Sequence, residues 1–398
     1  MRNLLPLLLV MVLLGPLGID LYLPTIPAIA KGLGSSESLI QSTISLFILV
    51  LGLGQLVTGY LVDRFGRRPM AVIGIILYIS GSLTAVFSVT PAMFIISRLL
   101  QGLAVCCTSV VAFSSVRDCF NGNEAARAFG FLNGTLNIVP ALAPLLGGIL
   151  AEYFGWRAPF GFLTLYAVVI LVLIVRYLPE TRPENKNGAK EKPLKIMISI
   201  LGNKRFLIFS LVNAGTMGMA LTYVSLAPTV LMGDAGLSPL LFSVVFGFNG
   251  FWIMAVSMIA NRIIQKAGRP VCLFTGGGMM IAGCAALVIS LLLMPADIQR
   301  HWLVYMLPVV ISCSGLAFIM GPATSYALEP YSDTAGVASA LVGFIQMAGG
   351  ALFALLAIAA PLPPKPALAI VMLCGGLLAW NAYRVSKNEQ QMKKESRE

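Results

Sequence analysis

The stretch GYLVDRFGRRPM, Gly59 to Met70, places four charged side chains in a short turn between two long apolar runs. An apolar run of about 20 residues is long enough to cross a bilayer as a helix. Arginine is costly in hydrocarbon, so Arg64, Arg67 and Arg68 hold such a turn at the membrane surface. The stretch therefore predicts a helical hairpin that crosses a membrane twice. The turn either serves only as a topology anchor or also has a mechanical role through Asp63.

Composition extends this prediction to the whole chain. Its 398 residues are 58% hydrophobic and 11% charged, whereas soluble domains average about 25% charged residues. We predict an all-α membrane protein with twelve transmembrane helices, because each crossing needs about 20 apolar residues. The predicted spans cover approximately residues 4–26, 39–61, 70–89, 92–114, 128–150, 158–178, 206–230, 240–264, 271–293, 302–324, 337–359 and 367–384.

The net charge of +11 is distributed unevenly along the chain. If the N-terminus is cytoplasmic, 22 of the 27 Lys and Arg residues fall on the inside, four fall in outside loops, and Arg98 lies in the membrane. This is the positive-inside distribution, so we expect both termini in the cytoplasm. The basic charge then serves topology and contact with lipid headgroups, and we expect no nucleic acid as a partner.

The stretch GYLVDRFGRRP resembles the loop-2/3 signature of the major facilitator superfamily, G-x-L-x-D-R-x-G-R-[RK]. The matching positions are Gly59, Leu61, Asp63, Arg64, Gly66, Arg67 and Arg68. The resemblance implies two six-helix bundles and a conformational latch, in which the acid of the turn meets the cytoplasmic end of helix 11 near Ala335 and Gly336. Gly59 would let helices approach closely. A weaker copy, NRIIQKAGRP at Asn261 to Pro270, follows about half a chain later and lacks the acid, as two parallel repeats would allow.

These spacings predict four parts of the chain. Residues 1–178 would form an N-terminal bundle, 179–205 a cytoplasmic linker, 206–384 a C-terminal bundle, and 385–398 a cytoplasmic tail. The linker is charged, contains Pro and Lys, and shows no apolar period in our interpretation. It is too short for a soluble domain.

One carboxylate, Asp20, lies in a run that carries no other charge from Asn3 to Ala30. An ionisable side chain at membrane depth costs about 3 kcal/mol and usually marks an ion or substrate path. Pro16 and Pro24 lie four residues before and after it, so all three share one helical face. Each proline interrupts the backbone hydrogen bonds. We therefore expect an irregular helix at the position of the acid.

Arg98, in SRLLQGLAVCC, is the only other charge away from the ends of a predicted span, and Gln101 follows one turn later. Its guanidinium stays protonated, so burial requires a carboxylate, carbonyl groups or water. Alternatively, the side chain reaches the outer surface. The pattern RxxQG is similar to the helix-4 signature of the superfamily, which is associated with proton handling. We predict that Asp20 and Arg98 form a coupled pair that binds protons and substrate.

The fifth predicted span, FLNGTLNIVPALAPLLGGIL, carries amides and prolines on one face. It resembles the antiporter signature on helix 5, which ends GPxxGG, with Ala143 here in place of the first Gly. We predict a cavity wall that contributes amides and a hinge, although the amides could equally serve as packing contacts between helices. The amides are Asn133 and Asn137, and the hinge residues are Pro140, Pro144, Gly147 and Gly148.

The second half has no carboxylate within a predicted span, so we assign proton coupling to the first half. Single polar residues in aromatic and Met-containing segments suit a pocket for varied apolar ligands, although ordinary helix packing explains each of them as well. The candidates for contact with substrate, besides Asp20, Arg98, Gln101 and the two amides, are Tyr22, Tyr223, Asn249 and Gln346.

Three further stretches, DLYLPTIP, SLAPTVLMGDAGLS and ALEPYSDTAGVASALVGFIQ, look like the bicyclomycin and chloramphenicol resistance subfamily of drug:proton antiporters. The resemblance implies export of an amphipathic, drug-like compound against protons across the bacterial inner membrane, by a functional monomer. A proton-coupled exporter of an endogenous metabolite is the nearer alternative, and a membrane scaffold or receptor the more distant one. The sequence has no GxxxxGK[ST] motif for ATP. We expect a transporter rather than an enzyme, without cofactor, metal or disulfide.

Overall fold

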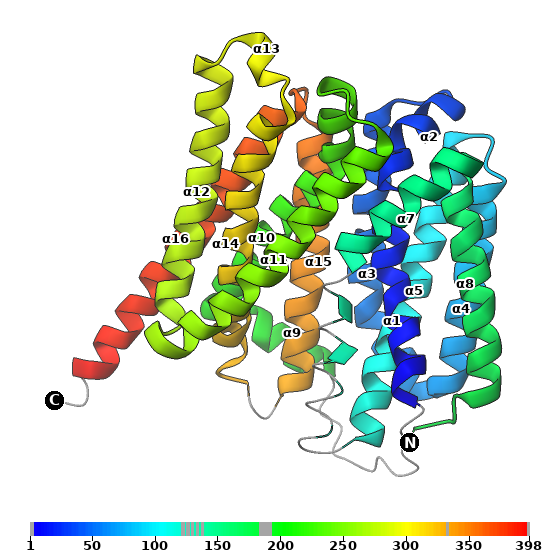
Figure 1. Ribbon diagram of the computed structural model, residues 1–398. Helices are drawn as coiled ribbons and strands as arrows, with labels where there is room; N and C mark the ends of the chain where they lie inside the picture. Colours follow the sequence, from blue (N-terminus) through cyan, green and yellow to red (C-terminus); the bar gives the residue numbers. More distant parts are fainter. Residues whose placement is uncertain are drawn as a thin grey trace. The chain divides into compact units, whose positions relative to one another are not determined.

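The computed structural model describes residues 4–120, 124, 128, 131–132, 135–136, 139–182, 193–331 and 334–395. Within these residues every regular element is helical (Figure 1). Eleven of the described helices are long and apolar enough to cross a membrane. They coincide with eleven of the twelve predicted spans. The fifth predicted span is described in part, as α7 (Val139–Phe154). The predicted all-α membrane fold is confirmed.

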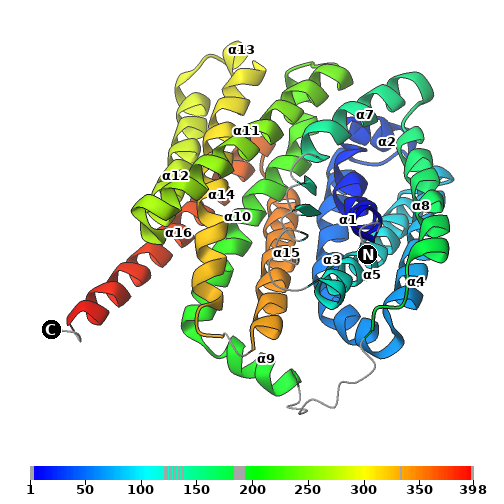
Figure 2. The same ribbon diagram turned by 60° about the horizontal axis from the view of Figure 1, so that its bottom comes forward.

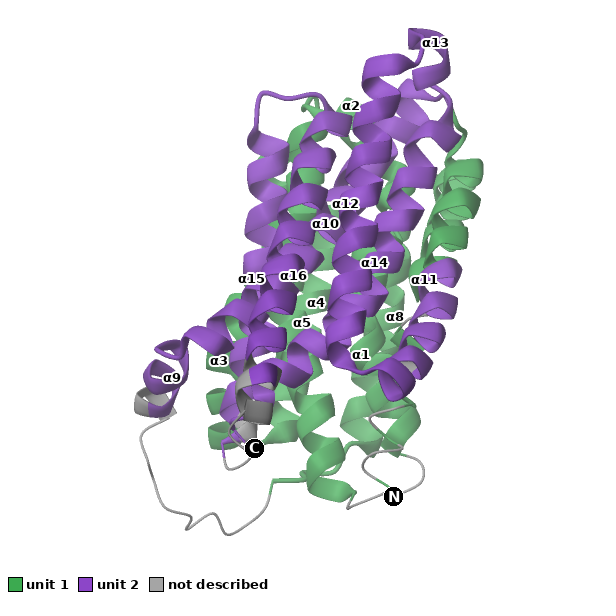
Figure 3. Cartoon of the chain, turned by 90° about the vertical axis from the view of Figure 1, so that its left-hand side faces the viewer, with its two compact units in different colours: residues 1–189, 237–250 green, residues 190–236, 251–398 purple. Residues whose placement is uncertain are grey.

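The chain divides into two compact units (Figure 3). Unit 1 contains residues 1–189 and 237–250, and unit 2 contains residues 190–236 and 251–398. The helices of unit 1 are α1 (Leu4–Asp20), η1 (Leu23–Thr25), α2 (Ile26–Gly32), α3 (Glu37–Phe65), α4 (Arg67–Val86), α5 (Pro91–Cys119), α7 and α8 (Ala158–Tyr177). The first half of α11 (Pro239–Ala267) also groups with unit 1.

In unit 1, α5 packs against α1, α3 and α4, and α8 packs against α4. Small residues allow these close crossings. A side chain at Gly102 of α5 would lie 2.6 Å from the backbone oxygen of Phe47 on α3. Local signals set the helix ends: Ser36 and Thr90 cap α3 and α5 by accepting hydrogen bonds from Leu39 and Met93.

Unit 2 contains the rest of α11 and eight further elements. Within it, α12 packs against α14 and α16, and α10 packs against α14, α15 and α16. Its elements are α9 (Pro193–Leu201), α10 (Lys204–Pro228), the π-helical η2 (Thr229–Asp234), α12 (Arg269–Leu293), α13 (Ala296–Gln299), α14 (Trp302–Leu328), α15 (Ala335–Ala359) and α16 (Pro364–Glu395).

The linker differs from the prediction in one respect. Helix α9 lies within residues 179–205, where we expected no apolar period, and it contacts α10 and α15 (Figure 2). Ile200 is buried there, whereas Ile198 is exposed. The run Ile196–Leu201 is too short for a periodicity over a longer window to reveal it, and packing against unit 2 stabilises it.

Candidate functional site

The first span is broken directly after Asp20. Helix α1 ends at this residue, and the span continues through the 3₁₀ turn η1 into α2. The expected irregularity beside the acid is confirmed. It lies on the side of Pro24, whereas α1 runs through Pro16 without interruption. Asp20 is buried, with 6% of its surface exposed.

Arg98 is fully buried on α5 and is held by neutral groups. Its Nη2 donates a hydrogen bond of 2.7 Å to the backbone oxygen of Gly18, and its Nη1 donates to Oε1 of Gln101. The guanidinium also lies over the rings of Tyr22 and Phe47, 4.4 and 4.8 Å from their centroids. Carbonyl groups and aromatic faces therefore stabilise this cation. The alternative interpretation, in which the Arg98 side chain reaches the outer surface, is wrong, because the side chain is fully buried.

The structure brings Asp20 and Arg98 to the same helix break without a direct ion pair. Within the described part of the chain, no Lys, Arg or His nitrogen lies within 4.0 Å of the Asp20 carboxylate in an ion pair. The link between the two residues is the backbone of Gly18. The structure therefore shows a bond from Arg98 to the backbone two residues before Asp20, and no direct contact between the two charged groups.

Two hydroxyl groups that the sequence did not single out support this arrangement. Ser82 on α4 accepts a hydrogen bond of 2.8 Å from Nε2 of Gln101, so it orients the amide that holds Arg98. The hydroxyls of Tyr22 and of Thr43 on α3 lie 3.0 Å apart. Ser and Thr are common in membrane helices, so their spacing alone carries no signal for this role.

The predicted helix-5 hinge packs against the helix break. A side chain at Gly147 would overlap the backbone oxygen of Leu21, the residue after Asp20. Gly148 faces Ser243 on α11, whose hydroxyl donates a hydrogen bond of 2.8 Å to the backbone oxygen of Pro144. Pro140 is half-buried at the start of α7. The two glycines thus allow α7 to approach α1 and the first half of α11 closely.

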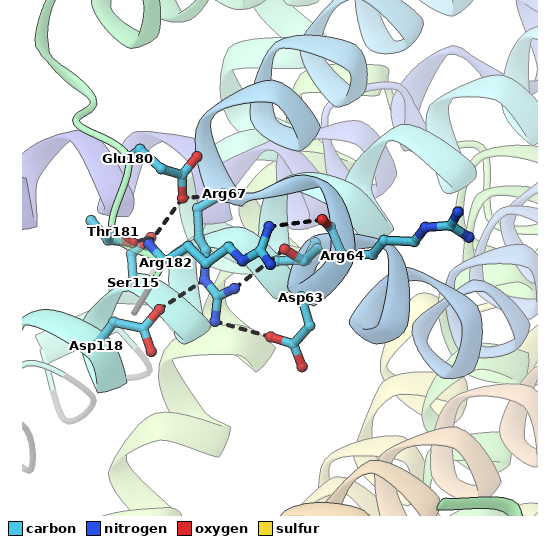
Figure 4. A network of polar contacts seen from close by, with 9 residues as sticks. Asp63, Arg64, Arg67, Ser115, Asp118, Glu180, Thr181 and Arg182 are labelled. Atoms are coloured by element: carbon cyan, nitrogen blue, oxygen red, sulfur yellow. Dashed lines mark hydrogen bonds and ion pairs between the residues drawn. The ribbon is translucent and has the colours of Figure 1, made fainter. Parts of the chain in front are cut away.

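The turn Gly59 to Met70 carries a network centred on Arg67, which is 1% exposed (Figure 4). Its Nε donates a hydrogen bond of 2.8 Å to Oδ2 of Asp118 on α5, and its Nη2 forms an ion pair of 3.0 Å with Asp63. Asp63 and Arg64 are exposed. The backbone oxygen of Arg64 accepts a hydrogen bond from Arg182.

Glu180 closes this network from the residues that follow α8. Its carboxylate accepts backbone N–H bonds from Arg67, Arg68 and Arg182 at 2.9, 3.1 and 2.9 Å, so it caps the N-terminus of α4. Partial burial raises the pKa of Glu180, but these donors and the Arg67 charge outweigh that effect and hold the pKa below its usual value. Gly66, with φ of 98°, brings the turn close to this carboxylate.

Unit 2 carries a related network at the corresponding turn. Gly268 also has a positive φ, 84°, and α12 begins at Arg269 as α4 begins at Arg67. Arg269 pairs with Glu329 at 3.4 Å, and Arg205 pairs with the same carboxylate at 2.7 Å. The acid that the second copy of the motif lacks is thus supplied by the end of α14.

Two predictions about the turn fare differently. In this structure a side chain at Gly59 would meet no atom within 4 Å, so the expected close helix approach there is wrong for this conformation. The expected contact of Asp63 with Ala335 and Gly336 stays a prediction, because the side chains of those two residues lie outside the described ones.

The remaining candidates lie on other helices or outside the described residues. Asn133 and Asn137 are not among the described residues. Tyr223 is buried on α10, with its ring 6.4 Å from that of Tyr305. Asn249 is buried on α11, and Gln346 is half-buried on α15. Their roles stay predictions.

Asp118 and Glu180 are the charged residues that the sequence reasoning missed. Both acids follow even-numbered predicted spans and therefore fall on the same side of the membrane as the turn. Their position on the same side as the basic turn is the sequence signal that points to them.

Known proteins resemble this chain in sequence over most of its length. The sequence profile described as Major Facilitator Superfamily matches residues 8–354. The chain is 32% identical over 365 residues to a "Chloramphenicol resistance protein" of Pseudomonas aeruginosa, covering 91% of this chain and 85% of that protein. It is 31% identical over 347 residues to "Multidrug resistance protein MdtL" of Escherichia coli O6:H1, covering 87% of this chain and 86% of that protein.

Solved structures share the fold at low sequence identity. A D-xylose-proton symporter superposes with a TM-score of 0.78 at 16% identity, covering 95% of this chain and 97% of that one. A peptide transporter, POT, superposes with a TM-score of 0.76 at 15% identity, covering 96% and 94% of the two chains. At such identities the similarity concerns the fold alone.

Proposed function

Because the chain belongs to the major facilitator superfamily of membrane transporters, we propose that it is a proton-coupled antiporter that exports amphipathic, drug-like compounds. The names of two relatives, a chloramphenicol resistance protein and a multidrug resistance protein, support drug-like substrates. The proposal of proton coupling is supported by one observation: Asp20 is a buried carboxylate at a helix break, two residues after the backbone oxygen that holds the buried Arg98.

The proposed cycle uses this arrangement. Charge in apolar surroundings costs free energy unless a proton or a cation neutralises it. Asp20 takes up a proton when the substrate site opens outward. Protonation weakens substrate binding and permits the transporter to return to the state that opens inward. Release of the proton inward restores the anionic site. Each inward proton supplies about 2.3 kcal/mol at a potential of 100 mV, negative inside.

Arg98 has a separate role in the proposal. Its guanidinium keeps its charge throughout, and its bonds to Gly18 and Gln101 do not depend on Asp20. It therefore provides a fixed positive field at the break, against which the protonated and ionised forms of Asp20 differ in energy. Tyr22 supplies an aromatic face at the same place.

We also propose the topology and assembly that the charge distribution and the family favour. Both termini face the cytoplasm of a bacterial inner membrane, transport proceeds by alternating access, and the protein functions as a monomer. On this topology the turn networks of Arg67 and Arg269 lie on the cytoplasmic side.

The test is substrate efflux from cells and everted vesicles, measured with and without an uncoupler. Asp20→Asn should abolish uncoupler-sensitive efflux while the protein stays folded and membrane-inserted. Glu152→Gln, at an exposed acid on α7, is the matched control and should transport like wild type. Wild-type efflux by Asp20→Asn would contradict the proposal. Failure of wild type to export dyes or chloramphenicol, with uncoupler-sensitive export of a sugar or amino-acid derivative, would favour the metabolite exporter.

A further inference from the structure

Unit 1 contains a cavity at the end that carries the turn network. It has a volume of about 940 Å³ and lies between the first turns of α1 and the ends of α5 and α8. Leu4, Leu7 and Val10 of α1 form one apolar wall, and Leu173 and Tyr177 of α8 form another. Sites for small organic molecules have volumes of about 300–1,000 Å³ and mostly apolar walls with a few polar groups. The cavity fits that description.

The cavity is separate from the proposed transport site. Val10 is the lining residue of α1 nearest in sequence to Asp20, and ten residues of helix span about 15 Å. Asp20, Arg98 and Gln101 are not among the lining residues. A ligand here would therefore occupy a second site.

The polar end of the cavity is negative. Among the described lining residues, the charged ones are Asp118 and Glu180, and no Lys, Arg or His joins them. Asp118 is 6% exposed, and its Oδ2 accepts from Arg67. Glu180 accepts backbone N–H bonds (Figure 4). Each carboxylate can accept further hydrogen bonds, while the single charge of Arg67 is shared among Asp118, Asp63 and Glu180.

We propose that this cavity binds a small organic amphipathic cation. Its apolar body would lie against α1 and α8, and its cationic group would lie at Asp118 and Glu180. A cation held against an apolar wall needs a partner of opposite charge, which the buried carboxylate of Asp118 and the exposed Glu180 supply. An organic anion would meet two carboxylates. The phosphate of a phospholipid would meet the same two acids and no Lys, Arg or His among the described lining residues, so the charge favours a small cation over a lipid.

The site borders the network that holds the turn. A bound cation would share Asp118 and Glu180 with Arg67 and with the N-terminus of α4. A bound cation would therefore weaken the bonds from Asp118 and Glu180 to the turn, because each carboxylate would interact with the ligand and with the turn at the same time. The inference goes beyond the proposed antiport, because it concerns a site that the transport cycle does not use.

The experiment measures binding of radiolabelled tetraphenylphosphonium to the full chain in nanodiscs of phosphatidylcholine and phosphatidylglycerol. All variants carry Asp20→Asn, which removes the charge of the transport site. Cys119→Lys adds a cation to the lining, and Cys119→Met adds similar length without charge. Leu173→Trp fills the cavity, whereas Val172→Trp changes an exposed neighbour that does not line it. Thermal unfolding verifies that each variant is folded.

We expect Cys119→Lys to bind the phosphonium at least about tenfold more weakly than Cys119→Met. Leu173→Trp should lose this binding and Val172→Trp should keep it. The neutral analogue triphenylphosphine oxide should bind at least about tenfold more weakly than the cation. Equal affinities within either variant pair would overturn the proposal. Loss of phosphonium binding when phosphatidylethanolamine is added to the nanodisc would assign the cavity to lipid and also overturn it. Neither result bears on whether Asp20→Asn abolishes efflux, so the two proposals fail separately.

Discussion

Arg98 is bonded to Gly18: the guanidinium of α5 donates a hydrogen bond of 2.7 Å to a backbone oxygen two residues before Asp20. The last turn of α1 leaves carbonyl oxygens without helical partners because the helix stops there. One of these oxygens satisfies the buried cation. The break therefore exposes a backbone acceptor for Arg98, and no ion pair of the Asp20 carboxylate is found among the described residues.

Ser82→Ala should disturb the Arg98 site through Gln101. The variant leaves Nε2 of the fully buried Gln101 without its acceptor, which costs about 1–3 kcal/mol. We expect a lower free energy of unfolding in detergent and weaker uncoupler-sensitive efflux. Ser80→Ala is the control, because Ser80 is exposed and bonds only to its own helix. Equal effects of the two substitutions would show that Ser82 does not position this site.

Gly147→Ala should separate α7 from the helix break. The added methyl group would overlap the backbone oxygen of Leu21, and overpacking of this kind costs about 1–3 kcal/mol or more. The melting temperature and the efflux should both fall, since Leu21 directly follows Asp20. Gly161→Ala on α8 meets no atom within 4 Å and should leave both unchanged. A variant Gly147→Ala as stable and active as wild type would contradict the packing described for α7.

Arg67→Ala should be far more damaging than Arg68→Ala, although the two residues are neighbours. Arg67 is buried, and removal of its side chain leaves Asp118 as an uncompensated buried charge. This loss costs about 3–5 kcal/mol of stability. Arg68 is exposed, and its removal should cost less than about 1 kcal/mol. Unfolding titrations in detergent measure both values. Similar losses for the two variants would argue against a buried pair at Arg67.

Glu180→Gln should alter the dependence of stability on pH. The folded-state pKa of Glu180 is lowered by its N–H donors and by Arg67. Its stabilising contribution is therefore fully present above the unfolded-state pKa, about 4.3, and is lost as pH falls through the folded-state pKa. Wild type should be more stable than the variant at neutral pH, and the difference should shrink in acid.

The control for this titration is Thr181→Val. It removes the hydrogen bond to Ser115 beside the same network but no titrating group. Its difference from wild type should not change with pH. A constant difference between wild type and Glu180→Gln down to strongly acidic pH would refute the role assigned to the carboxylate.

Much of the fold followed from the sequence. Spans of about 20 apolar residues, with 22 of 27 basic residues on one side, predict the helices and their order. Asp20 and Arg98 stood out because charges are rare and costly at membrane depth. The helix break was predictable as well, since Pro24 cannot donate a backbone hydrogen bond. Helix α9 was missed because its apolar run is short.

The partners of the site residues could not be read from the sequence. Local patterns indicate which side chains are costly to bury, but not which groups of distant helices meet them. Ser82 supports Gln101, Leu21 touches Gly147, and Glu180 caps a helix 113 residues earlier in the chain. Each of these contacts joins residues far apart in sequence.

The sequence by itself thus determined that the chain crosses the membrane, approximately where its spans lie, and which two charges lie at membrane depth, because the free energy of placing a residue in hydrocarbon depends on its polarity. Only the tertiary structure decided that Arg98 binds a backbone oxygen rather than the Asp20 carboxylate, and that two acids beside the turn line one end of a cavity. Such choices depend on the distances between packed helices, and those are set by the fit of side chains across the whole unit.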